Sequence, residues 1–145
     1  MKQVKFYYCV GSRTFLLDMG ESSSQCRCEG LELLEANTVD VSIEKHVPVF
    51  NATKNHLTVR VGSQSHPMSP EHYIEWIFVQ TTAGGIYRKL LPGDQPEACF
   101  PVKRKEVLGV YAYCNLHGLW KAGSAEAWEF NETAYAAPFF PEPNM

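Results

Sequence analysis

The feature of the sequence that most restricts its fold is a series of short β-prone runs, separated by turn residues, that begins at residue 37. Residues 56–61 alternate apolar and polar side chains, and residues 73–80 are rich in aromatic and β-branched side chains. A turn over 81–85 then leads into a return strand, which predicts a hairpin. We expect strands over 56–61, 73–80, 85–91, 98–102 and 107–114. Their spacing, with no long amphipathic helix and no internal repeat, predicts an all-β protein built around a β-sandwich.

The expected domain organisation has three parts, which cover residues 1–36, 37–121 and 122–145. The first part is expected to be a small β-rich unit, with strands over 4–8 and 13–17. A unit of this size buries too little core to fold alone, so it needs a metal or a partner surface. The last part has no lysine or arginine but several glutamates and aromatic residues. We therefore expect it to pack on its own domain or on a second subunit.

Length and composition exclude several classes of protein. The chain has 145 residues, and no run approaches the roughly 18 to 20 apolar residues that span a bilayer. Its first residues lack an apolar core followed by a small-residue cleavage site, so we expect no secretory signal and a cytoplasmic location. A net charge of -3 argues against a broad nucleic-acid-binding surface. The five cysteines are an odd number, so metal binding or burial is favoured over a disulfide framework.

Four of the five histidines lie beside turn or strand-end signals, and one of them follows a cysteine by three positions. The Cys114-x-x-His117 step lets one turn present two ligands to one metal. His66 and His72 can present two more from another loop, and His46 can add one from a third segment. One thiolate with several imidazoles suits iron, zinc or copper. Taken singly, each is an ordinary polar residue of a loop. Taken together, the five side chains outnumber the four ligands of a tetrahedral zinc site. Around an octahedral metal they would leave one position free.

These five residues lie in three longer motifs. The motifs are Glu44-Lys45-His46-Val47-Pro48, His66-Pro67-Met68 with His72, and Cys114-Asn115-Leu116-His117-Gly118-Leu119-Trp120-Lys121. They are accompanied by Glu75-Trp76-Ile77, Pro92-Gly93-Asp94 and Pro96-Glu97-Ala98. In combination, over roughly residues 37–121, the motifs resemble the superoxide reductase family, which includes desulfoferrodoxin and neelaredoxin. The resemblance implies an immunoglobulin-like β-sandwich that holds one mononuclear non-haem iron.

The resemblance also implies a role for each residue of the motifs. The equatorial ligands of the iron would be His46, His66, His72 and His117. Cys114 would be the axial thiolate, Glu44 the residue that occupies the sixth position of the oxidised iron, and Lys45 the cation beside the open face. Without the resemblance, Glu44 and Lys45 would be interpreted as solvated surface charges. The implied reaction reduces superoxide to hydrogen peroxide with one electron and two protons.

The resemblance therefore predicts a cytoplasmic superoxide reductase, an enzyme with one iron per chain that cycles between Fe2+ and Fe3+. Its expected partners are superoxide and an external electron donor such as rubredoxin, with no nucleic acid and no membrane. A homodimer or higher homo-oligomer is expected from the family. Two alternatives stay open. One, within metal chemistry, is an iron-binding electron-transfer protein, and the other, from another class, is a non-catalytic immunoglobulin-like binding module whose histidines and cysteines are incidental.

The N-terminal unit resembles desulforedoxin but departs from its four-cysteine iron site. Ser12 stands where the second cysteine of the pair begun by Cys9 would be, and Cys26 and Cys28 are separated by one residue. A tetrahedral thiolate site needs four soft ligands, so we expect a metal-free remnant that serves packing or dimerisation. A zinc ion held by the three thiols and another group is one alternative. A disulfide that joins Cys28 to Cys26 or to Cys9 is another.

Two further residues have no such motif around them. His56 is expected to be structural or exposed, and Cys99 to lie in the core within the strand over 98–102.

Overall fold

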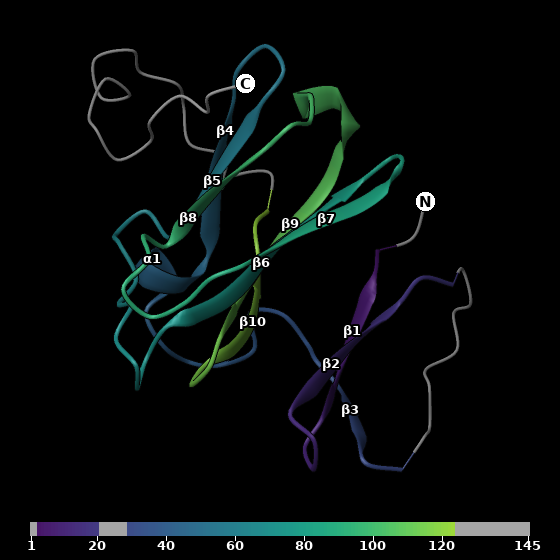
Figure 1. The fold of residues 1–145 in the computed structure, drawn as a ribbon, viewed down its shortest axis with the longest axis vertical. Helices are drawn as coiled ribbons and strands as arrows, with labels where there is room; N and C mark the ends of the chain where they lie inside the picture. The colour runs from purple at the N-terminus through teal and green to yellow at the C-terminus, as the bar shows by residue number, and fades with distance from the viewer. Residues whose placement is uncertain (1–2, 21–28, 124–145) are drawn as a thin grey trace.

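The structure, a computed structural model that describes residues 3–20 and 29–123, is almost entirely β (Figure 1). Its first three strands, β1 (Lys5–Cys9), β2 (Thr14–Asp18) and β3 (Leu31–Leu33), form a small antiparallel sheet in the order β2-β1-β3. A second sheet has the order β4-β5-β8 and contains β4 (Pro48–Ala52), β5 (Leu57–Val61) and β8 (Glu97–Phe100). A third has the order β10-β9-β6-β7 and contains β6 (Ile74–Thr81), β7 (Gly84–Lys89), β9 (Val107–Cys114) and β10 (Gly118–Lys121). Helix α1 (Ile43–His46) precedes β4, and a 3-10 turn, η1 (Arg104–Glu106), precedes β9.

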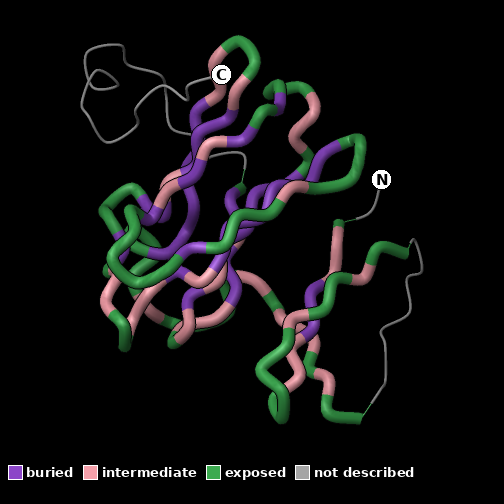
Figure 2. The backbone as a smooth tube through the Cα atoms, in the orientation of Figure 1, coloured by how far each residue is buried: buried purple, intermediate pink, exposed green. Residues whose placement is uncertain are grey.

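The core lies between the second and third sheets, which pack as a sandwich. Leu57, Val59 and Val61 of β5 are 0% exposed and belong to one apolar cluster with Ile77 and Val79 of β6. Figure 2 shows this buried layer along the middle of both sheets. Burying an aliphatic side chain of this size stabilises the folded state by roughly 1.5–3 kcal/mol, so these alternate, inward-facing residues hold the two sheets together. The expected all-β sandwich is confirmed.

The strands expected in the sandwich are present, with bounds that differ by about two residues at most. Three short strands were not expected, namely β3, β4 and β10. Strand β4 begins at Pro48 and β10 begins at Gly118, and both residue types normally interrupt a strand. Both strands lie at sheet edges, where β4 pairs with β5 and β10 pairs with β9, so long-range pairing outweighs local preference there.

The expectation that Cys99 lies in the core is wrong. Successive residues of a strand point to opposite faces, and in β8 the core side chains are those of Ala98 and Phe100. Cys99 therefore points to the outer face, where it is half-buried and its Sγ lies 3.5 Å from the Thr58 hydroxyl oxygen. His56 is also half-buried, in the turn before β5 and away from the other histidines.

The small N-terminal sheet packs against the outer face of the third sheet through a second apolar cluster. The ring of Phe6 lies 5.1 Å from that of Trp76, 5.3 Å from that of Phe78 and 5.1 Å from that of Tyr111. Phe6 is only 5% exposed, so the sheet buries its apolar side against its neighbour rather than in a core of its own. We propose that residues 1–36 are a dependent unit and residues 37–121 the domain that supports it.

This dependence predicts that Phe6→Ala strongly lowers the stability of the protein. The variant is expected to lose about 3–5 kcal/mol of unfolding free energy, because the truncation leaves a cavity among the three aromatic rings. Leu16→Ala in the same small sheet is the matched control, since Leu16 is 44% exposed, and it should change stability by less than about 0.5 kcal/mol. Urea denaturation followed by tryptophan fluorescence measures both. Equal stability of the two variants would contradict the proposed dependence.

The cysteines of the N-terminal unit are only partly described. Cys9 ends β1 as a half-buried free thiol, and hydrogen bonds from Ser12 lower its pKa. Cys26 and Cys28 lie outside the described residues, so the metal-free remnant and its alternatives stay predictions. Among the described residues, none of the helices has the length and apolar character needed to cross a membrane.

Candidate metal centre

The pairing of the strands brings four chain segments together at one end of the sandwich. Strand β4 begins beside the end of β5, and β6 begins beside the end of β9. Helix α1 carries His46, the loop between β5 and β6 carries His66 and His72, and the turn between β9 and β10 carries His117. Cys114 is the last residue of β9.

The four imidazole rings form a square. Neighbouring ring centres lie 4.7 Å apart for His46 and His66, 4.6 Å for His66 and His72, 5.0 Å for His72 and His117, and 4.9 Å for His117 and His46. Each ring is tilted by 79° to 85° from its neighbours, and the diagonal pair His46 and His72 is separated by 6.2 Å. The rings are therefore arranged edge-on around a common point.

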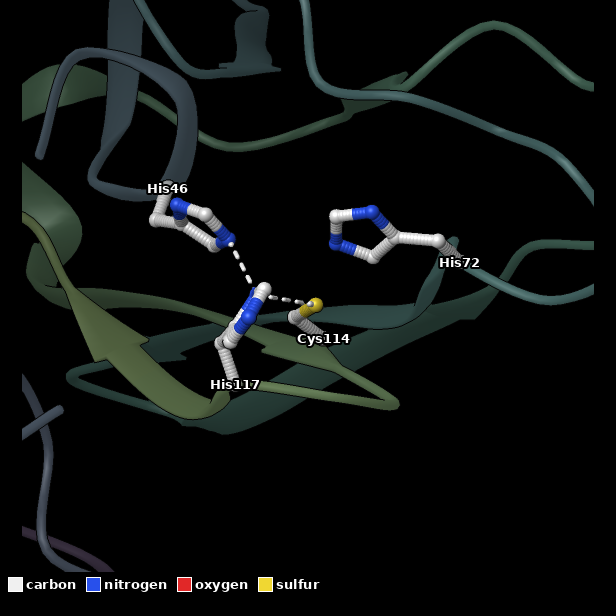
Figure 3. Close-up of side chains that lie close together, drawn as sticks. All are labelled: His46, His72, Cys114 and His117. Atoms are coloured by element: carbon white, nitrogen blue, oxygen red, sulfur yellow. Dashed lines mark hydrogen bonds between the residues drawn. The ribbon is translucent and has the colours of Figure 1, made fainter. Parts of the chain in front are cut away.

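The thiol of Cys114 completes the cluster. Its side chain is 0% exposed, and Sγ lies 3.7 Å from Nδ1 of His117 (Figure 3). The ligand atoms of His46, His72, Cys114 and His117 all lie within 4.8 Å of one another, and this group could hold a metal ion. His66 is not in that group but fills the fourth corner of the ring square.

Hydrogen bonds orient the rings toward the centre of the square. Nδ1 of His46 lies 2.7 Å from the Ser42 carbonyl oxygen, and Nδ1 of His66 lies 2.6 Å from that of Pro67. A ring whose Nδ1–H donates to a carbonyl keeps the lone pair of Nε2 for a metal. Nε2 of His66 and Nε2 of His72 are buried and have no hydrogen-bond partner. A ligand bound among the rings would give both nitrogens a partner.

The distances fit a metal bound by perpendicular ligands. Nε2 of His46 lies 3.0 Å from Nδ1 of His117. Two nitrogens bound at about 2.1 Å to one ion, at a right angle, are separated by about 3.0 Å. Four imidazoles with one thiolate are also a donor set that suits iron. The residues present therefore fit the iron that the sequence analysis predicts.

Burial lowers the pKa of three of the imidazoles. The pKa of His66 falls to about 4 because burial disfavours the charged ring, although its bond to Pro67 acts in the opposite direction. Burial is also the largest cause of the lowered pKa of His46 and of His72. These rings are consequently neutral at pH 7, which is the form that binds a metal.

Two opposing effects act on the pKa of the Cys114 thiol. Burial raises its pKa most strongly, whereas hydrogen bonds from the backbone amides of Leu116 and His117 lower it. These amides come from the β9–β10 turn and point at the sulfur. A metal cation at the centre would favour the thiolate further.

Glu44 and Lys45 lie on α1 directly before His46, and both are exposed. The Ser42 hydroxyl donates a 2.8 Å hydrogen bond to Glu44 Oε2, and this bond is the largest cause of the lowered pKa of Glu44. The charge of Lys45 contributes to the lowered pKa of both His46 and His72. Lys45 is thus close enough to act electrostatically on two corners of the square.

Two residues that position the site were missed by the sequence analysis. Asn115 ties the β9–β10 turn to the loop that carries His72: its Oδ1 accepts from the Tyr73 amide at 2.9 Å, and its Nδ2 donates to the Glu71 carbonyl at 3.0 Å. Gly62 lets α1 approach the β5–β6 loop, because a Cβ there would lie 2.5 Å from the Glu44 carbonyl oxygen. Neither residue type signals this role, because both roles depend on a distant segment.

The fold and this side-chain set define a class, the β-sandwich proteins whose imidazole and thiol side chains together could hold a metal ion. Comparison with known proteins narrows the class. The family model described as desulfoferrodoxin matches residues 38–123. Desulfoferrodoxin from Syntrophotalea carbinolica is 41% identical over 123 residues, covering 83% of this chain and 97% of the relative. Desulfoferrodoxin from Nitratidesulfovibrio vulgaris is 44% identical over 124 residues, covering 83% of this chain and 96% of the relative.

A solved structure agrees with the sequence comparisons. The crystal structure of the superoxide reductase from Treponema pallidum superposes with a TM-score of 0.70 at 36% identity, covering 84% of this chain and 100% of that chain. The chain belongs to the desulfoferrodoxin family. This confirms the resemblance found in the sequence, and the family supports an oxidoreductase function and the binding of iron.

Proposed function

We propose that the protein is a superoxide reductase, which reduces superoxide by one electron to hydrogen peroxide at a single non-haem iron. The observation that carries the proposal is the square of four imidazoles with one thiol beside it. His46, His66, His72 and His117, together with Cys114, are the residues that would hold the iron. The solved relative from Treponema pallidum, named a superoxide reductase, supports the same reaction.

The iron, when bound, supplies the electron that reduces superoxide. The residues of the chain prepare the site for that event. The neutral imidazoles leave the positive charge of the ion largely uncompensated, which favours an anionic substrate. The carbonyls of Ser42 and Pro67 hold two rings in one orientation. The amides of Leu116 and His117 stabilise the negative sulfur of Cys114.

Lys45 and Glu44 are the proposed catalytic residues outside the ligand set. The exposed ammonium of Lys45 attracts superoxide to the histidine square and orients a water that delivers a proton to the product. Glu44 is held by the hydroxyl of Ser42, and its carboxylate is proposed to close the oxidised site after the product leaves. Two charges of opposite sign on one turn of α1 thus serve successive stages of the cycle.

The partners follow from the same proposal. Superoxide is the proposed substrate, and an external one-electron carrier such as rubredoxin is the proposed donor. A homodimer or higher homo-oligomer and a cytoplasmic location are part of the proposal as well.

Pulse radiolysis of the reduced, iron-loaded protein tests the proposed function. Superoxide generated by the pulse should oxidise the protein in a second-order reaction, with one hydrogen peroxide formed per superoxide consumed and no dioxygen released. The absence of oxidation, in protein that carries about one iron per chain, would contradict a superoxide reductase and favour an electron-transfer protein.

A further inference from the structure

The outer face of the β4-β5-β8 sheet is buried almost as deeply as the core. Along β4 and β5 the core side chains alternate with Val49, Asn51 and Thr58, which therefore point to the outer face. These three side chains are only 7%, 5% and 2% exposed. An antiparallel sheet that packs one face on a core commonly leaves its other face to water. In this sheet, by contrast, the outer face is covered as well.

The same face carries buried polar atoms without a partner. Nδ2 of Asn51 and Oε2 of Glu97 are both buried and have no hydrogen-bond partner. Nε2 of His56 is in the same condition, and the backbone bond from Thr53 to His56 continues the pairing of β4 with β5. By alternation His56 lies on the side of Thr58. A cover that brings polar groups to this face would give all three atoms a partner.

The charges on this face favour an acidic cover. Arg60 is opposite Glu97 in the register of β5 and β8. Burial raises the pKa of Glu97 to about 7, and burial is also the cause of the lowered pKa of Arg60. At neutral pH the guanidinium keeps its full charge, whereas the carboxyl group is only partly ionised. The pair therefore leaves the face with an excess of positive charge.

The cover belongs to the same chain, because these exposures are those of one chain alone. Among the described residues, Val49 belongs to neither of the two apolar clusters, which points to a cover outside them. The N-terminal sheet packs on the opposite side of the sandwich, against the outer face of the third sheet (Figure 1). Residues 1–2 and 21–28 directly adjoin strands of that N-terminal sheet. Residues 124–145 are therefore the segment to consider.

This C-terminal segment begins at a suitable place and is long enough. The amide of Ala122 donates to the Val110 carbonyl at 2.9 Å, and Ala122 belongs to the core cluster between the two sheets. The chain thus leaves the described structure at the seam of the sandwich. Residues 124–145 could extend by up to roughly 70 Å, whereas packed sheets are about 10 Å apart. The outer face is well within reach.

The composition of the segment matches the face. It has no lysine or arginine, so its carboxylates give it a negative charge, and its aromatic rings can cover apolar surface. The match to the family model ends at residue 123, so the segment lies outside the domain that the family shares. The acidic residues are Glu126, Glu129, Glu132 and Glu142, and the aromatic residues are Trp128, Phe130, Tyr135, Phe139 and Phe140.

We propose that residues 124–145 fold back over the outer face of the β4-β5-β8 sheet, with aromatic side chains against Val49 and Thr58 and glutamates beside Arg60. The N-terminal sheet then covers one side of the sandwich and the C-terminal segment covers the other. A face covered by its own chain is closed to a second copy, so a homo-oligomer would use another surface.

Cys99 reports on this face, because it is a half-buried free thiol opposite Thr58. Alkylation of the iron-loaded, full-length protein by iodoacetamide is followed at each cysteine by peptide mass spectrometry. Replacing the five aromatic residues of the segment by serine is expected to speed the alkylation of Cys99 about tenfold, because the thiol loses its cover. The rate at Cys9, which lies in the N-terminal sheet, should stay the same.

The control variant replaces Asn131, Thr133 and Asn144 by serine, which alters the same segment but keeps every aromatic ring. Its Cys99 should react as in the unmodified protein. An unchanged rate at Cys99 in the aromatic-to-serine variant would overturn the proposal, and so would equal acceleration at Cys99 and Cys9, which indicates general loosening. If dilution of the unmodified protein exposes Cys99, the cover comes from a second copy and the intramolecular arrangement is excluded.

The contact is also tested from the side of the sheet, by Val49→Asp in protein labelled with 5-fluorotryptophan. The fluorine NMR signal of Trp128, assigned with Trp128→Phe, is expected to move to the position of the free amino acid, because the new carboxylate repels an acidic segment. Val39→Asp is the control, since Val39 is 42% exposed and lies outside this face, and the Trp128 signal should stay in place. A Trp128 signal already at the free position in the unmodified protein would contradict the proposal.

If Val49→Asp does not fold, the alkylation rates decide by themselves. Neither measurement uses the reaction with superoxide, so a failure of the proposed function is distinguishable from a failure of this inference.

Discussion

Cys114→Ser is expected to abolish the visible thiolate-to-iron charge-transfer absorption of the oxidised protein and to slow its reaction with superoxide by at least about 100-fold. The sulfur is fully buried and receives hydrogen bonds from two backbone amides. A serine oxygen at the same place is a harder donor with a much higher pKa, so it cannot replace the electron donation of a thiolate. Absorption spectroscopy and pulse radiolysis measure the two effects.

Cys99→Ser is the matched control for this experiment. Cys99 is a free thiol on the outer face of β8, so its replacement should leave the absorption and the reaction unchanged. Iron content must be measured in both variants, because loss of the metal alone would also remove the absorption. A charge-transfer band that persists in iron-loaded Cys114→Ser would contradict the proposed role of Cys114 as an iron ligand.

Lys45→Ala is expected to slow the second-order reaction with superoxide by about tenfold at low ionic strength. The exposed ammonium acts on two histidines of the square, so its removal lowers the attraction of an anion to that site. The dependence of the rate on salt should weaken at the same time, since screening has less charge to act on. Iron content and the visible spectrum should stay as in the unmodified protein.

Lys54→Ala provides the control for net charge. Lys54 is exposed in the turn between β4 and β5, at the end of the sandwich opposite the histidines. Its removal changes the total charge by the same amount but not the charge beside the site. If both variants react with superoxide at the same rate, Lys45 has no local role and steering by this residue is excluded.

Much of the fold could be predicted because its signals are local. The run before Thr81, rich in aromatic and β-branched residues, and the glycine-containing turn after it predict β6 and β7 without any knowledge of their partners. Strands β4 and β10 could not be predicted in this way. Their first residues, Pro48 and Gly118, normally interrupt a strand, and they are ordered by pairing with β5 and β9.

The prediction for Cys99 was wrong for a related reason. Its strand was predicted, but its face depends on which of two alternating sets of residues points at the opposite sheet. A shift of the pairing register by one residue would exchange the two sets of side chains between the faces. Only the pairing of β8 with β5, in which Cys99 is opposite Thr58, decides that the thiol lies on the outer face.

The sequence by itself determined the residue types of the candidate metal centre, because the Cys114-x-x-His117 step and the motifs around His46, His66 and His72 are contiguous in the chain. Only the tertiary structure decided that these segments form a square. His46 and His117 are 71 positions apart, yet two of their ring nitrogens lie 3.0 Å from each other. Such a distance results from the pairing of strands and from the contacts of Gly62 and Asn115, and it has no local signal in the sequence because each contact joins segments that are remote along the chain.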